Sequence, residues 1–347
     1  MSEGMNRRDF MKYSMATGML LAAGERLQSI ATAGEAAKIT EVDKLTLWVV
    51  ADNYYDTNRA EGRNTKRYRS VPGKSMHAEH GLSYYVETVV DGKASTCMFD
   101  YGLDPVGVMN NIALLGLDIG KTNAFGLSHG HWDHYGTAVT ILKQNQSRIT
   151  AGTSFYVGEE AFAHRYAVRP GATEPADLGQ LQRSDLEALG LKVVEVTSST
   201  QIIPGAFLTG NIERHTSYEK VAKNLLIKRG DKLEPDDMRG EQALFFNVKG
   251  KGLVVLSGCA HGGIVNTLRQ AQKVSGIEKV HAIIGGFHLV NAKPEVIQST
   301  IADIKAMKPD HIVPAHCTGF EAIAAFNKEM PDAFTLNTAG TKYAFGA

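Results

Sequence analysis

The feature that most constrains this chain is residues 128–134, which read Ser-His-Gly-His-Trp-Asp-His. Three of the chain's twelve histidines and one aspartate fall within six residues there, far denser than scatter over 347 residues would give. An apolar run at residues 123–127 precedes the segment, and a second apolar run follows at residues 137–142. The pattern predicts a buried strand, a tight turn rich in metal-ligand side chains, and then a helix.

The spacing within this turn predicts a metal centre. Alternate side chains of an extended chain share a face, so His129 and His131 point the same way and can bind one metal ion. Asp133 and His134 are adjacent, and at the start of a helix they can turn toward a second ion. Imidazole nitrogen and carboxylate oxygen are suitable ligands for zinc, iron or manganese.

Later in the chain, the same arrangement recurs at three strand ends. Residues 253–256, 281–284 and 311–314 each read as a buried strand that runs into glycine or other small residues and a histidine. Loops at strand ends are where α/β folds place their chemistry. The pattern predicts His261 and His316 as further metal ligands, and it makes His288 a candidate for contacting the substrate or the leaving group.

Five segments together carry a family resemblance. The pattern His-x-His-x-Asp-His at residues 129–134 resembles the signature of the metallo-β-lactamase superfamily. Within it, the chain is similar over residues 45–325 to the branch of 7,8-dihydropterin-6-methyl-4-(β-D-ribofuranosyl)aminobenzene-5′-phosphate synthase. The segments are EHGLS at 79–83, SHGHWDH at 128–134, SGCAH at 257–261, GGFHL at 285–289 and PAHCTG at 314–319. The resemblance implies an αββα sandwich of two mixed β-sheets, with helices on the outer faces and metals at one edge between the sheets.

One position departs from the wider superfamily. Many members have an aspartate that bridges two metals where this chain has Cys259. A thiolate can also bridge, and because it is softer it favours zinc or iron over manganese. Alternatively, Cys259 does not bind, and we prefer this interpretation. The expected ligands of the first ion are then His129, His131 and His261, and those of the second are Asp133, His134 and His316. One or two divalent ions are expected, with zinc preferred and iron or manganese as alternatives.

The resemblance implies a metal-dependent hydrolase. A metal-activated water would attack a phosphoester, phosphodiester, lactone or similar bond of a small-molecule substrate. Asp133 is expected to accept a proton as well as bind metal, so that Asp133 and His288 are the catalytic candidates. The residues expected to contact the substrate are Asn53, Glu79, His80 and His288. Alternatives are a condensing enzyme like the synthase, a di-iron oxidoreductase, and a non-catalytic protein that binds metal or ligand.

The first residues of the chain resemble an export signal. Residues 6–12, Asn-Arg-Arg-Asp-Phe-Met-Lys, resemble the twin-arginine motif, and an apolar run follows at residues 13–24. Small residues at 31–33 predict cleavage before Gly34. The apolar run is shorter than the roughly 20 residues of a transmembrane helix, so no stable membrane anchor is expected. We therefore expect residues 1–33 to be a signal peptide, and residues 34–347 to be exported folded by the twin-arginine machinery to a prokaryotic periplasm or another extracytoplasmic compartment.

Charge and the weaker patterns complete the prediction. Lysine plus arginine and aspartate plus glutamate each number 37, and this balance gives no reason to expect a nucleic-acid partner. Residues 155–191 and 211–240 lack a clear pattern, and we interpret them as insertions beside the site that shape substrate access. Residues 148–152 are predicted to form a strand, and Cys97 is predicted to be a buried apolar side chain.

Overall fold

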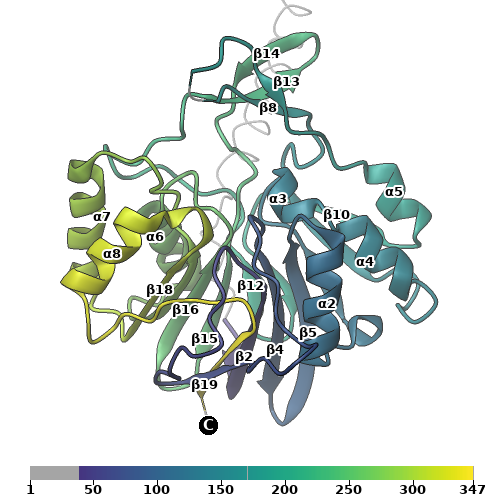
Figure 1. Cartoon of the computed structure of the whole chain (residues 1–347), viewed down its shortest axis with the longest axis horizontal. Helices are drawn as coiled ribbons and strands as arrows, with labels where there is room; N and C mark the ends of the chain where they lie inside the picture. Colours follow the sequence, from purple (N-terminus) through teal and green to yellow (C-terminus); the bar gives the residue numbers. More distant parts are fainter. Residues whose placement is uncertain (1–38, 170, 347) are drawn as a thin grey trace, which may run out of the picture. The chain divides into compact units, whose positions relative to one another are not determined.

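Two mixed β-sheets packed face to face form the centre of this computed structural model, which describes residues 39–169 and 171–346 (Figure 1). The predicted signal peptide, residues 1–33, lies outside the described residues. Within the described part of the chain, no helix is long and apolar enough to cross a membrane.

The first sheet has the strand order β10-β7-β6-β5-β4-β2-β19-β3. Its strands are β2 (Lys44–Ala51), β3 (Thr65–Arg67), β4 (Ser83–Val90), β5 (Lys93–Tyr101), β6 (Ala124–Gly126), β7 (Ser154–Gly158), β10 (Lys192–Val196) and β19 (Thr341–Gly346). Strands from β5 to β10 pair in parallel, and the others pair antiparallel. Asp91 and Gly92, both at positive φ, form the tight turn of the β4–β5 hairpin.

The second sheet has the order β11-β12-β15-β16-β17-β18, and a short strand β1 pairs with β15. The bounds are β1 (Glu41–Val42), β11 (Thr200–Ile203), β12 (Ala206–Leu208), β15 (Leu244–Val248), β16 (Gly252–Ser257), β17 (Val280–Gly286) and β18 (His311–Ala315). Strands β16, β17 and β18 are parallel neighbours, so their carboxyl ends lie at one edge of the sheet.

Alternation along the strands separates the apolar side chains into layers. In β4, Tyr84 and Val86 pack between the sheets, whereas Tyr85 packs under the helices of the first sheet. In β16, Val254 faces the other sheet and Val255 faces the helices of the second sheet. This is the period of two that a sheet buried on both faces requires.

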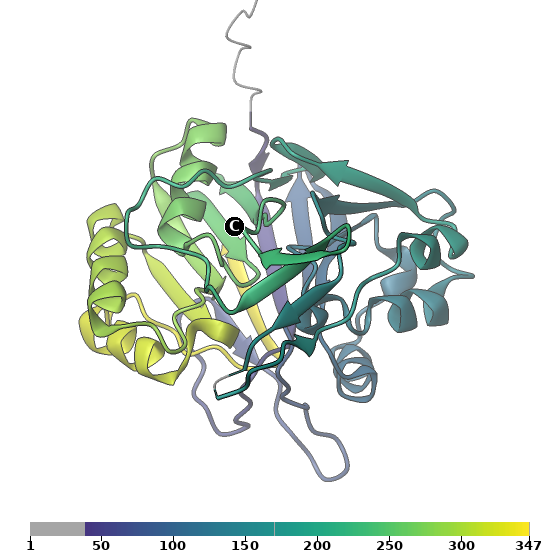
Figure 2. The same cartoon turned by 90° about the horizontal axis from the view of Figure 1, so that it is seen from above.

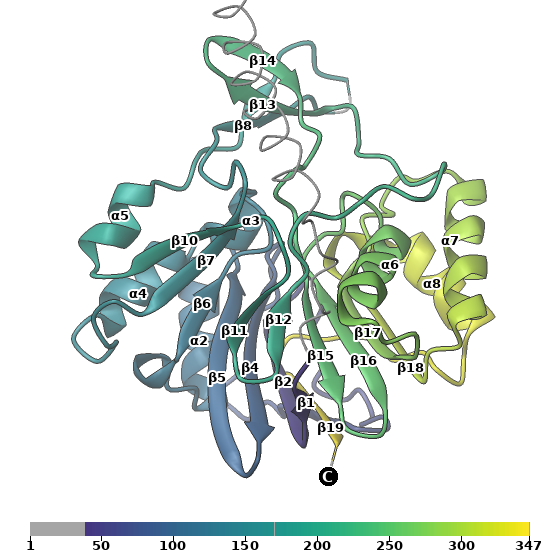
Figure 3. The same ribbon diagram turned by 180° about the vertical axis from the view of Figure 1, so that it is seen from behind.

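Helices cover both outer faces (Figures 1 and 3). Those on the first sheet are α2 (Pro105–Leu115), α4 (Ala138–Asn145) and α5 (Arg183–Ala188), and those on the second are α6 (Ile264–Ser275), α7 (Pro294–Met307) and α8 (Phe320–Glu329). Asp104 caps α2 by accepting a hydrogen bond from the backbone N–H of Val106, and Gly116 ends the helix in the left-handed conformation. The predicted αββα sandwich is confirmed.

The segments predicted as insertions form a third, smaller sheet together. Its order is β14-β13-β8-β9, with β8 (Arg165–Ala167) and β9 (Ala176–Asp177) from the first segment and β13 (Leu225–Arg229) and β14 (Lys232–Pro235) from the second. The small sheet lies above the end of the sandwich that carries the short helix α3 (Trp132–Tyr135) (Figures 1 and 3), and seen from above it crosses the middle of the molecule (Figure 2). The predicted strand at residues 148–152 is wrong: the backbone N–H groups of Arg148 and Ile149 bond to the carbonyl of Asn145, which makes a turn after α4.

A buried ion pair ties the small sheet to the histidine-rich turn. Arg165 Nε lies 2.8 Å from Asp236 Oδ2, and both side chains are almost fully buried. Arg165 Nη1 also donates to the carbonyl of Glu160 at 2.9 Å and to that of Gly130 at 3.4 Å. The guanidinium thereby links both predicted insertions to the turn.

Gly158 and Gly240 pack backbone against backbone where β7 meets the second of these segments. A Cβ at Gly158 would overlap the carbonyl oxygen of Gly240. We therefore expect Gly158→Ala to lower the free energy of unfolding by about 1–3 kcal/mol, the usual penalty for overpacking. Thermal unfolding measures the change. The nearest atom to a Cβ at Gly62 is Thr65 Oγ1, at the ordinary contact distance of 3.5 Å, so Gly62→Ala is the control. Equal midpoints for both variants would contradict the close contact.

Candidate metal centre

The predicted ligands gather at one edge of the sandwich, where strands of both sheets end. Strand β6 of the first sheet leads through residues 127–131 into α3. In the second sheet, β16 ends just before Cys259 and His261, β17 just before His288, and β18 just before His316. Because β16, β17 and β18 are parallel and in register, their last residues place these side chains beside one another.

His129, His131 and His261 form the first ligand group. His129 Nε2 lies 3.0 Å from His131 Nδ1 and 3.2 Å from His261 Nε2. Zinc–nitrogen bonds of 2.0–2.1 Å in a tetrahedron would separate the nitrogens by about 3.3–3.4 Å. The two spacings measured from His129 Nε2 are therefore close to those of ligands on one tetrahedral ion.

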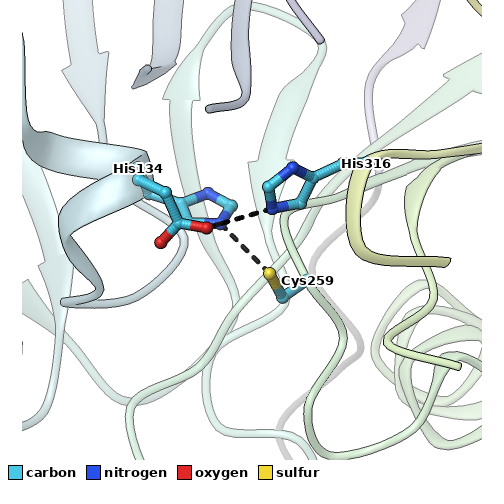
Figure 4. Close-up of side chains that lie close together, drawn as sticks. His134, Cys259 and His316 are labelled. Carbon is cyan, nitrogen blue, oxygen red and sulfur yellow. Dashed lines mark hydrogen bonds and ion pairs between the residues drawn. The ribbon is translucent and has the colours of Figure 1, made fainter. Parts of the chain in front are cut away.

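Asp133, His134 and His316 form the second group. Asp133 Oδ2 lies 3.2 Å from His316 Nε2 and 3.7 Å from His134 Nε2. Figure 4 shows the rings of His134 and His316 and the side chain of Cys259 turned toward one another. This group contains carboxylate oxygen as well as imidazole nitrogen, a mixed set that suits zinc, iron or manganese.

Cys259 lies between the two groups. Its Sγ is 3.1 Å from His134 Nε2. One ligand atom from each of Asp133, His134, Cys259 and His316 lies within 4.8 Å of the others, and the same is true of His129, Cys259 and His261. Cys259 is thus placed where its sulfur could bridge two ions, as the bridging alternative requires.

Asp100, at the end of β5, orients a histidine in each group. Its Oδ2 lies 2.7 Å from His134 Nδ1 and accepts a hydrogen bond of 2.8 Å from Ser128 Oγ. Ser128 Oγ in turn lies 2.9 Å from His129 Nδ1. These acceptors place the ring proton of both histidines on Nδ1 and leave each Nε2 free to bind metal.

The remaining ligands are held by other buried carboxylates. Asp52 Oδ1 accepts a hydrogen bond of 2.9 Å from the backbone N–H of His316, and Glu241 Oε1 accepts one of 2.6 Å from that of His261. Sequence reasoning missed Asp52, Asp100 and Glu241. Asp52 directly follows β2 and Asp100 lies at the end of β5, so the strand-end rule applied to acidic residues could have found them; Glu241 has no such signal.

Burial governs the electrostatics of the first group. It lowers the pKa of His129, His131 and His261 well below the ordinary value, which keeps these imidazoles neutral and able to bind metal. The second group is charged. Burial alone would raise the pKa of Asp133, but the neighbouring His134 and His316 outweigh it and hold the pKa well below its usual range.

His134 shows the opposite balance. Burial alone would lower its pKa, but Asp100 and Asp133 raise the pKa of His134 to about 9. A cation is therefore favoured between these two carboxylates, and the residues present fit a bound metal ion.

Left-handed backbone at non-glycine residues, with φ of 58° at Asp100, 54° at Ala260 and 50° at His316, is strain of the kind found at functional sites.

The predicted substrate residues differ in their surroundings. His80 is largely exposed, and its Nε2 lies 3.6 Å from Asp133 Oδ2. Asn53 Oδ1 lies 3.2 Å from His316 Nδ1 and orients that ring. Glu79 accepts hydrogen bonds from the backbone N–H groups of Leu103 and Asp104, both 2.7 Å, so the structure gives it a role in holding that loop.

Two cavities border the centre. One, of about 440 Å³, is lined by His261, His288 and Phe287, and also by Lys220 from the second predicted insertion. The other, of about 540 Å³, is lined by Asn53 and His316 together with Arg59, Tyr54 and Phe320. Concave sites with a few convergent polar groups are where small molecules bind.

Comparison with known proteins gives relatives of both sequence and fold. The chain is 30% identical over 305 residues to 7,8-dihydropterin-6-methyl-4-(β-D-ribofuranosyl)aminobenzene-5′-phosphate synthase of Methanocaldococcus jannaschii, covering 87% of this chain and 97% of the relative. A crystal structure of a metal-dependent hydrolase of the β-lactamase superfamily matches with a TM-score of 0.68 at 23% identity, over 87% of this chain and all of that one. The metallo-β-lactamase fold protein YhfI of Bacillus subtilis matches with a TM-score of 0.51 at 11% identity, over 87% of this chain and all of that one. No family model matches the sequence.

Asp100 provides a test of the centre that leaves every predicted ligand in place. In Asp100→Asn, the charge that orients His134 and Ser128 is lost, and we expect metal affinity to fall about 10–100-fold. Competition with a chromophoric chelator measures this affinity. Asp231→Asn, at an exposed residue of the β13–β14 hairpin, is the control and should keep the wild-type value. Unchanged affinity in Asp100→Asn would contradict the orienting role.

Proposed function

Because the chain belongs to the family of 7,8-dihydropterin-6-methyl-4-(β-D-ribofuranosyl)aminobenzene-5′-phosphate synthase within the metallo-β-lactamase superfamily, we propose that it is a metal-dependent hydrolase. The observation that carries the proposal is the pair of ligand groups that meet at Cys259 between two cavities. The bond cleaved is a phosphoester, phosphodiester, lactone or similar bond of a small molecule. The preferred metal is zinc, which both the imidazole nitrogens and the Cys259 thiolate suit.

Bound divalent ions would activate a water molecule near neutral pH and polarise the oxygen of the bond that is cleaved. The chain supplies the rest. His129, His131 and His261 hold one ion, and Asp133, His134 and His316 hold the other. Burial of these side chains strengthens their electrostatic interactions with a substrate, because the surroundings screen charge poorly.

Asp133 and His288 have further proposed roles. Asp133 stays ionised, because the neighbouring His134 and His316 hold its pKa well below its usual range, and this suits the carboxylate to bind an ion. Its proposed second role, accepting a proton, is opposed by the same low pKa. His288 lines the smaller cavity, and its ring centroid lies 4.0 Å from that of His261, so it is placed to contact the substrate or the leaving group. Asn53 and His80 are the proposed substrate contacts on the side of His316.

A second candidate is a condensing enzyme, which the 30% identity to the synthase favours. By the relative's name, the substrates would provide a dihydropterin and a ribofuranosylaminobenzene phosphate. The two cavities that border the centre are compatible with two partners. Product formation from such a pair, without hydrolysis of esters, would favour this function over the hydrolase.

Metal content separates the remaining alternatives. Tightly bound iron with a visible absorption band would favour a di-iron oxidoreductase. Full metal loading without turnover of phosphoesters, phosphodiesters, lactones or amides would favour a protein that binds metal or ligand without catalysis.

The hydrolase proposal makes a direct prediction for two ligands. We expect His131→Ala and Asp133→Ala to lower the kcat/KM for a chromogenic phosphodiester or lactone by more than about 100-fold, because each removes a direct metal contact. His77→Ala, at an exposed histidine away from the ligand groups, should retain the wild-type value. Wild-type hydrolysis in both ligand variants would contradict the proposal.

We also propose that the twin-arginine machinery exports the folded chain to the periplasm or an equivalent compartment. Replacement of Arg7 and Arg8 by lysine should then retain the protein in the cytoplasm, because the twin-arginine signal is recognised by that machinery. Fractionation of bacterial cells followed by immunoblotting measures the distribution. Arg169→Lys, at an exposed residue, is the control. Equal export of both variants would contradict a twin-arginine signal.

A further inference from the structure

A third cluster of potential ligands lies beside the paired groups. Cys259, His288 and Cys317 come from the ends of the adjacent strands β16, β17 and β18. The two sulfur atoms and one ring nitrogen of His288 all lie within 4.8 Å of one another. Both cysteines are buried, with 2% and 6% of their surface exposed. The hydrolase proposal gives Cys317 no role.

Gly286 explains how sulfurs from strands that are not neighbours can approach. It ends the middle strand, β17, between the two cysteines. A Cβ at Gly286 would lie 2.7 Å from Cys317 Sγ and 3.2 Å from the Cα of Cys259. Any other residue would therefore occupy the space through which Cys317 reaches Cys259. Cys317 Sγ already donates a weak hydrogen bond of 3.5 Å to the carbonyl of Cys259.

His288 provides an independent indication of a ligand. Its Nδ1 is buried, and among the described residues it has no hydrogen-bond partner. A buried polar atom without a partner is unfavourable, and a bound ion is one of the few groups that can supply one. The backbone of His288 has a φ of 43°, a strained conformation for a residue that is not glycine. Since imidazole has two nitrogens, one can bind an ion while the other faces the cavity.

We propose that Cys259, His288 and Cys317 bind a thiophilic divalent ion, with zinc as the natural occupant, in addition to the ions of the paired groups. Two thiolates and one imidazole are a ligand set that zinc takes when a fourth position is left open, and a set without carboxylate disfavours magnesium and manganese. Each cysteine loses its thiol proton to solvent when it binds. Cys259 also lies beside the paired groups, so the ion lies next to them, and the sulfur then links this ion to one of those groups instead of bridging both.

Cobalt(II) added alone to the metal-free chain under anaerobic conditions tests the proposal, because sulfur-to-cobalt charge transfer reports bound thiolates. We expect Cys317→Ala to bind one ion fewer per chain and to lose at least half of this absorption, since the Cys317 thiolate is removed and the ion that Cys259 shares with it is lost. Cys97→Ala is the matched control. Cys97 is buried between the sheets, and this variant should keep both the absorption and the ion count.

Several outcomes would overturn the proposal. Equal absorption and equal ion counts in the wild type, Cys317→Ala and Cys97→Ala would show that Cys317 does not bind. A count of two fewer free thiols per chain, restored by a reductant while the metal content stays unchanged, would show that Cys259 and Cys317 form a disulfide instead. If Cys317→Ala does not fold, X-ray absorption at the zinc edge of the wild type counts the sulfur ligands, and a single sulfur per chain would refute a two-thiolate site. None of these readouts depends on hydrolysis, so they test the site separately from the proposed function.

Discussion

The close approach of His134 to Cys259, 3.1 Å between Nε2 and Sγ, joins the two sheets at the edge where the candidate centre lies. His134 follows a strand of the first sheet, and Cys259 follows a strand of the second. The two ligand groups are assembled in the same way: each combines two side chains from the histidine-rich turn with one histidine that follows a strand of the second sheet. The centre therefore depends on how the two sheets pack, and a bound ion would in turn hold them together.

The rest of the fold keeps this edge in place. The apolar layer between the sheets sets their separation, and the alternation of β4 and β16 supplies side chains to that layer and to the helix-covered faces at once. Asp100 then orients His134 directly and His129 through Ser128. On the outer side, the Arg165–Asp236 ion pair fixes the small sheet to the turn. The segments that border the smaller cavity are thus tied to the same turn that carries the ligands.

The sequence predicted the parts of the site that depend on local spacing. The ligands of the turn at residues 129–134 could be predicted, because alternate and adjacent positions place four ligand side chains within one turn. His261 and His316 could be predicted because each follows a buried strand that runs into small residues. Asp100 lies at a strand end but was missed, because that rule was applied to histidines alone and the partners of Asp100 lie 28 to 34 residues away. Glu241 was missed because its partners lie 20 to 21 residues away and no period connects them. The position of Cys259 between both groups depends on the packing of two sheets, which spacing along the chain does not encode. The two insertions could be predicted because the regular strand and helix pattern breaks off there. Their joining in one sheet depends on pairing between β8 and β13, which lie far apart along the chain.

Anomalous diffraction at the zinc absorption edge, from crystals of the zinc-loaded chain, tests the central claim most directly. The account predicts one peak among His129, His131 and His261 and another among Asp133, His134 and His316, with Cys259 Sγ between them. The absence of a peak at either position, or zinc bound only elsewhere, would contradict the assignment of this edge as a metal centre.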